Sequence, residues 1–142
     1  DFMQYRVELT IKRKRDDVVA LYVNRDTMHQ WEKGLTDIND HHGHLFETGS
    51  EGSMVFQFGD QEMTMEVTTE YNNLPDQIIQ IFKVPGAVNR CDNHFYERRG
   101  ETHWVMDVSF DFDVDPKIPE DKFHKKTLEG MTQFKTFVEG VK

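Results

Sequence analysis

The feature of this sequence that most limits its fold is a change in the spacing of its apolar residues. Up to Asp113 they recur at every second position in several segments, which is the period of a strand with one face buried and one in water. From about Glu120 the spacing changes to three and four, the period of an amphipathic helix. The chain therefore predicts a sheet followed by one long helix.

Two short helices are expected between the first strand and the remaining strands. Residues 5–11 alternate apolar and polar side chains and predict the first strand. Asp16 is placed to cap a helix that ends at Tyr22, and residues 27–33 predict a second short helix that ends at Gly34.

Turn residues indicate how two pairs of strands are aligned. A two-residue turn at residues 60–61 would place Phe56 opposite Met65 and Met54 opposite Val67, all on one face. A turn at Arg99 and Gly100 gives a second hairpin on the same reasoning. Its facing pairs are Phe95 with Trp104, Asn93 with Met106 and Cys91 with Val108.

The strand at residues 77–84 has apolar residues on both faces. We assign to the inner face Ile78, Gln80, Phe82 and Val84. Ile79 and Ile81 then lie on the outer face, where uncovered apolar surface would be a reason to form a homodimer.

The final helix carries an apolar stripe that faces the sheet. The stripe consists of Phe123, Thr127, Met131, Phe134, Val138 and Val141. A single α+β domain over residues 1–142 follows, in which a curved antiparallel sheet wraps around the helix. The inner face is rich in Met and Phe, which can line an adaptable cavity or fill a core.

Composition and charge limit the partners of the chain. Its net charge of −9 repels phosphate backbones and anionic lipids, so we expect no nucleic-acid partner, and the basic run at residues 12–15 is interpreted as solvated charge. No apolar run approaches the roughly twenty residues of a membrane span. One cysteine, Cys91, cannot form an internal disulfide, which suits a soluble protein of the cytoplasm.

The sequence contains few groups of side chains that could bind a metal ion or act in catalysis. His41, His42 and His44 could hold a metal ion, but neighbouring side chains of an extended segment point to opposite sides, and no further ligand motif follows. We therefore interpret them as a polar loop and expect neither a metal nor another cofactor. Cys91 is interpreted as a small core residue, and no serine-elbow, phosphate-loop or dinucleotide motif is present.

Several short motifs together resemble the SRPBCC superfamily, the helix-grip domains related to START lipid-binding domains, the birch-pollen allergen and polyketide cyclases. They are Asp16-Asp17-Val18, Trp31-Glu32-Lys33-Gly34-Leu35, Gly49 to Gly52, Asn73-Leu74-Pro75, Gly100-Glu101-Thr102 with Trp104, and the last helix with Met131 and Phe134. The resemblance implies an apolar or lipid-like ligand held between the sheet and the last helix, and catalysis in some members.

Candidate ligand-binding residues follow from the inward positions and from this resemblance. They are Trp31, Met54, Phe56, Met65, Val67, Tyr71, Asn93, Trp104, Met106, Phe110, Met131 and Phe134. Asn93 stands out because a buried amide must find hydrogen-bond partners in protein, water or ligand. A cyclase- or dehydratase-like enzyme would need an acid or base on the inner face, and none of the seven histidines is assigned there, so binding is favoured; a filled core is the third alternative.

Overall fold

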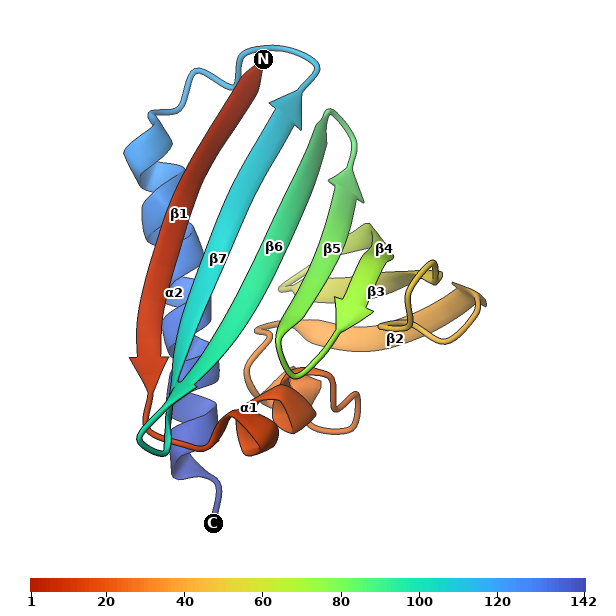
Figure 1. The fold of residues 1–142 in the computed structure, drawn as a ribbon. Helices are drawn as coiled ribbons and strands as arrows, with labels where there is room; N and C mark the ends of the chain where they lie inside the picture. Colours follow the sequence, from red (N-terminus) through yellow and green to blue (C-terminus); the bar gives the residue numbers. More distant parts are fainter.

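The computed structural model describes residues 1–142 as an antiparallel sheet of seven strands with one long helix and two short helical segments (Figure 1). The elements in chain order are β1 (Phe2–Ile11), α1 (Arg15–Tyr22), η1 (Met28–Gln30), β2 (Leu35–His42), β3 (Glu51–Phe58), β4 (Gln61–Asn73), β5 (Gln77–Val84), β6 (Ala87–Arg98), β7 (Glu101–Phe112) and α2 (Glu120–Gly140). The strands lie in the order β1-β7-β6-β5-β4-β3-β2. This arrangement confirms the predicted α+β fold class.

Helix α2 packs against the β1 end of the curved sheet (Figure 1). The predicted apolar stripe supplies its fully buried residues, Met131, Phe134 and Val138. The basic run after β1 anchors the end of this helix, because Arg13 donates a hydrogen bond of 2.9 Å to the carbonyl oxygen of Glu139. A cation is favourable at that position, where the negative end of the helix dipole lies. None of the helices combines the length and apolar character needed to cross a membrane.

The two short helical segments differ in detail from the prediction. Helix α1 begins at Arg15 after Lys14, so Asp16 lies in its first turn and is not its cap. A carboxylate in the first turn still interacts favourably with the helix dipole, which explains the similar sequence signal. The second segment is a single 3-10 turn, Met28–Gln30, shorter than the predicted helix.

Of the two predicted hairpins, one has the predicted pairing of residues and the other does not. Strands β6 and β7 pair as expected, with Phe95 opposite Trp104. Strands β3 and β4 are shifted by two residues, since Met54 lies opposite Met65. The turn begins one residue earlier than predicted, at Gly59, whose φ of 61° suits a tight two-residue turn. A shift of two residues leaves every side chain on its predicted face, so Met54 remains buried.

Strand β5 places Ile78 and Gln80 on the inner face as predicted, and both are buried. Its outer-face residue Ile79 is only 7% exposed in the single chain. Ile81, the other residue that suggested a homodimer, is half-buried, so this apolar surface is largely covered within the single chain.

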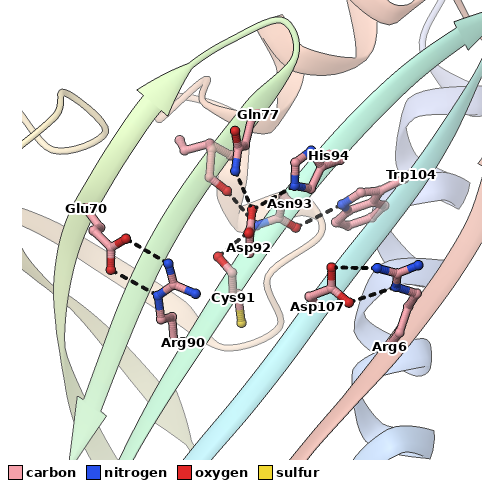
Figure 2. A network of polar contacts seen from close by, with 11 residues as sticks. Arg6, Glu70, Gln77, Arg90, Cys91, Asp92, Asn93, His94, Trp104 and Asp107 are labelled. Atoms are coloured by element: carbon pink, nitrogen blue, oxygen red, sulfur yellow. Dashed lines mark hydrogen bonds and ion pairs between the residues drawn. The ribbon is translucent and has the colours of Figure 1, made fainter.

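The outer face of the sheet is held by polar pairs (Figure 2). Arg6 of β1 binds Asp107 of β7 through two hydrogen bonds of 2.8 and 3.1 Å, and Arg90 of β6 binds Glu70 of β4 in the same manner. Because these pairs are exposed to water, each adds little to the stability of the fold. Their main consequence is that charge covers the outer face, whereas the inner face is left for apolar packing.

Candidate functional site

A cavity of about 230 Å³ lies between the inner face of the sheet, the α1–η1 segment and α2. Eleven of its seventeen lining residues are hydrophobic. The lining consists of Tyr22, Met28, Trp31, Glu32, Phe46, Met54, Met65, Gln80, Phe82, Asn89, Cys91, Trp104, Met106, Lys126, Thr127, Gly130 and Met131. Drug-sized ligands usually occupy about 300–1,000 Å³. The space therefore suits a compact molecule.

The twelve candidate residues divide into four groups. Those lining the cavity are Trp31, Met54, Met65, Trp104, Met106 and Met131. Those buried in the surrounding core without lining it are Phe56, Val67, Asn93 and Phe134. Phe110 packs near the start of α2, with its ring centroid 5.2 Å from that of Phe123. Tyr71 is 42% exposed and lies away from the cavity.

The position of Tyr71 corrects the sequence interpretation. Strand β4 contains an irregularity between Thr69, which pairs with Gln80, and Tyr71, which pairs with Ile79. The extra residue, Glu70, interrupts the alternation of faces, as in a β-bulge. Thr69 is therefore fully buried, whereas Tyr71 lies on the outer face with Ile79.

Asn93 is fully buried and its amide is bound by protein groups. Its Oδ1 accepts a hydrogen bond of 2.9 Å from Nε1 of Trp104, and its Nδ2 donates to the carbonyl oxygen of Ile78 at 3.3 Å. Figure 2 shows this amide beside the Trp104 ring. Asn93 supports the cavity wall through Trp104.

An aromatic cluster forms one wall of the cavity. The ring of Phe134 lies between those of Trp31, Tyr22 and Trp104, at centroid distances of 4.6, 5.4 and 5.4 Å. Phe46, from the loop between β2 and β3, adds a further ring, although its φ of 84° is unusual for a residue with a side chain. Asn72 holds this loop by donating a hydrogen bond of 2.6 Å to the carbonyl oxygen of Phe46.

The cavity contains a few polar groups. Burial raises the pKa of Glu32 from 4.5 to about 7, which places its titration near neutrality. Burial also raises the pKa of Cys91 to about 12, so this thiol remains protonated. Nε1 of Trp31 and Nε2 of Gln80 are buried and have no hydrogen-bond partner in the protein.

Glu32 was missed by sequence reasoning, which assigned no acid to the inner side. The residue follows a 3-10 segment of three residues, Met28–Gln30, and no periodicity can be measured over so short an element. Its neighbour Trp31 was the only available signal, because an inward Trp at a helix end brings adjacent residues near the cavity.

The histidines at the end of β2 make separate contacts. Nε2 of His41 lies 3.2 Å from the hydroxyl of Ser53, and Nε2 of His44 lies 3.4 Å from Nη1 of Arg25. The structure has no group of three or more His, Cys, Asp or Glu side chains arranged to hold a metal ion.

Comparison with known proteins gives no match to a family and none to a curated sequence. Solved structures do match. Ara h 8.0201 superposes with a TM-score of 0.81 at 8% identity, over 97% of this chain and 98% of that one. The protein of unknown function SA2116 from Staphylococcus aureus gives 0.76 at 13% identity, over 98% and 94%. Ginseng major latex-like protein 151 from Panax ginseng gives 0.75 at 9% identity, over 96% and 97%.

The chain has the helix-grip fold. The match covers nearly the whole of each chain, so the sheet and the last helix correspond throughout. At these identities the likeness extends to the helix-grip fold alone. The chemistry of the cavity must therefore be argued from this chain's own side chains.

Proposed function

We propose that this helix-grip domain binds a small, mainly apolar molecule in the cavity between the sheet and α2, as a carrier or sensor of that molecule. The observation that supports it is a space of about 230 Å³, partly open to solvent, whose lining includes eleven hydrophobic residues beside the packed core. Apolar side chains that line an open pocket remain in contact with water, which is unfavourable. A ligand would remove this apolar surface from water.

Two further features agree with the proposal. Met side chains adapt to ligands of different shape, and five of the seven Met residues line the cavity. The resemblance to START-related and birch-pollen-allergen-like domains implies the same kind of ligand.

Cys91 is a free, buried thiol, which is compatible with the reducing cytoplasm proposed as the location.

A second candidate function is acid–base catalysis on the bound molecule, as in cyclase- or dehydratase-like enzymes. One observation favours it: Glu32 lines the cavity, and burial raises its pKa to about 7. A carboxyl group with a pKa near the working pH can both accept and donate a proton. No hydrogen bond links Glu32 to a second acid or base, so binding remains the first proposal. If the Glu32→Gln variant bound the molecule as tightly as wild type but no longer converted it to product, this result would favour the catalytic function.

The binding proposal is tested with toluene and methyl-labelled methionine. Titration should shift the NMR signals of the five cavity methionines, Met28, Met54, Met65, Met106 and Met131. Met3 and Met63 lie outside the lining and serve as internal controls. Native mass spectrometry of freshly purified protein would reveal any ligand that is already bound.

A blocking variant makes the test specific to this cavity. Gly130 of α2 lines the cavity, and a Cβ atom built on it would meet nothing within 4 Å. Gly130→Leu should therefore fill part of the space and weaken toluene binding by about tenfold or more. Gly140→Leu is the matched control, since Gly140 also has open space but lies outside the lining. Unchanged toluene affinity in a folded Gly130→Leu protein would contradict the proposal.

A further inference from the structure

Glu32 is an acid in the cavity wall that has no partner in the protein. Burial is the one cause that shifts its pKa, so neither a basic group nor a hydrogen-bond donor compensates its charge. Other partly buried acids are paired. Glu139 lies 2.9 Å from the ammonium group of Lys135, and Asp107 lies 2.8 Å from the guanidinium group of Arg6. A desolvated carboxyl group without such a partner is unfavourable in its ionised form.

The carboxyl group of Glu32 faces the cavity. Its side chain keeps accessible surface, whereas the unpartnered nitrogens of Trp31 and Gln80 are sealed inside the protein. Burial, and to a smaller extent the charge of Glu32, raise the pKa of the Cys91 thiol and of the Tyr22 hydroxyl. These two groups belong to β6 and α1, and both residues line the cavity. The carboxyl group is therefore close to two other walls of the same space.

Aromatic rings lie in the same part of the wall. Trp31 precedes Glu32 in the chain, and its ring stacks on that of Tyr22 with a centroid distance of 5.7 Å. The ring of Trp104 lies 5.8 Å from that of Tyr22, and all three rings line the cavity. The faces of Trp and Tyr rings attract positive charge, and a carboxylate neutralises it. Together these groups have the chemistry of a site for an organic cation.

We infer that the mainly apolar ligand carries a basic nitrogen, and that its ammonium group pairs with the carboxylate of Glu32 beside the rings of Trp31 and Tyr22. This inference rests on the proposed binding function. The apolar body of the ligand would occupy the Met-rich part of the cavity, and its ammonium group would supply the partner that Glu32 lacks. The net charge of −9 also favours the approach of a cation over that of an anion.

The other titratable groups of the lining do not compete for this role. They are Tyr22, Cys91 and Lys126. Burial raises the pKa values of Tyr22 and Cys91, so both groups stay neutral near pH 7. Lys126 on α2 is exposed, its charge is screened by water, and it contributes nothing to the pKa of Glu32. An anionic ligand would have to leave water for an apolar space beside Glu32, which repels it.

Four probes of similar size and different charge test the inference: toluene, benzyl alcohol, benzylammonium and benzoate. Titrations followed by the signals of the cavity methionines give their affinities. Benzylammonium should bind at least about tenfold more tightly than benzyl alcohol at about pH 8, because only the cation pairs with the carboxylate. Its affinity should fall by more than about tenfold as the pH is lowered to about 5.5, since Glu32 takes up a proton near pH 7. The affinity for benzyl alcohol should change little over this range.

Variants assign the effect to its carboxylate. Glu32→Gln keeps the shape of the side chain and removes its charge. It should reduce the preference for benzylammonium over benzyl alcohol to less than about twofold, remove the pH dependence and leave toluene binding in place. Glu62→Gln, on the exposed start of β4, changes the net charge equally outside the lining and should leave the preference unchanged. If Glu32→Gln fails to fold, the probe series and its pH dependence in wild type still decide the question.

The outcomes distinguish this inference from the binding proposal. Equal affinity of wild type for benzylammonium and benzyl alcohol, a preference for benzoate, or an undiminished preference for benzylammonium in Glu32→Gln would overturn the amine inference and leave a ligand cavity in place. Failure of all four probes to shift the cavity methionines would overturn the binding proposal itself.

Discussion

Nε1 of Trp104 on β7 donates a hydrogen bond of 2.9 Å to Oδ1 of Asn93 on β6, and both residues are almost completely buried (Figure 2). The bond joins two adjacent strands on the inner face of the sheet. It also fixes the Trp104 ring, which forms part of the cavity wall.

Replacing Asn93 by Leu should destabilise the fold, because Nε1 of Trp104 and the carbonyl oxygen of Ile78 would lose their partner inside the core. We expect the free energy of unfolding, measured by urea denaturation, to fall by about 2–4 kcal/mol. The same change in a Trp104→Phe background should cost less, since no indole N–H group is then left unpaired. Equal costs in the two backgrounds would show that the bond contributes nothing.

Glu32 should make stability depend on pH near neutrality. Burial raises its pKa in the folded state to about 7 from an ordinary value of 4.5, so the folded protein binds this proton more tightly than the unfolded chain. Protonation of Glu32 therefore favours the folded protein over the unfolded chain. This contribution to stability is fully present below pH 4.5 and is lost as the pH rises through about 7. Between these pH values wild type should lose on the order of 2 kcal/mol relative to Glu32→Gln.

Urea denaturation of wild type and Glu32→Gln over this pH range measures the difference directly. The comparison cancels the titration of groups that the two proteins share. A difference in unfolding free energy that stays constant with pH would show that Glu32 is not desolvated.

Gly52 on β3 should not tolerate a side chain. A Cβ atom at this position would lie 2.2 Å from the carbonyl oxygen of Asn39 on β2, which is backbone and cannot rotate away. Gly52→Ala should therefore lower the free energy of unfolding by about 2–4 kcal/mol. Gly130→Ala provides the contrast, because its Cβ meets nothing within 4 Å and helix propensity favours Ala by about 1 kcal/mol. Similar effects of the two substitutions on thermal unfolding would refute this steric argument.

Cys91 should resist alkylation in the folded protein. Burial raises the pKa of its thiol to about 12, and the thiolate is the species that reacts with iodoacetamide. We expect the native protein to be labelled at least about 100-fold more slowly than the urea-unfolded chain, as followed by intact mass. Labelling at the same rate in both states would mean that the β6 strand opens readily.

Alternation and turn chemistry predicted most of the sheet. Arg99 and Gly100 both have positive φ angles, of 56° and 78°, and the turn predicted at these residues gives the observed pairing of β6 with β7. The β3–β4 turn could not be placed from composition, because Gly59, Asp60 and Gln61 allow two neighbouring turns. Alternation did not separate them, since registers that differ by two residues bury the same side chains.

The cavity was less predictable than the sheet. Glu70 sits in an alternating strand, and nothing in its type marks the irregularity that turns Tyr71 outward. Phe134 has an inward position in the helix stripe, yet it is packed among other rings and does not line the cavity. Periodicity identifies which face is buried, but the boundary between filled and empty space depends on how side chains from distant segments meet.

The sheet order also has a consequence for synthesis. Phe2 of β1 lies opposite Asp111 of β7, so the first strand has no partner until the seventh has been made. At about 5–20 residues per second on a ribosome, that delay is on the order of 5–20 s. Strands β2 to β7 each pair with a neighbour in the chain and can form hairpins as they emerge. The apolar side chains of β1 are therefore the part of the nascent domain that a chaperone would have to shield for the longest time.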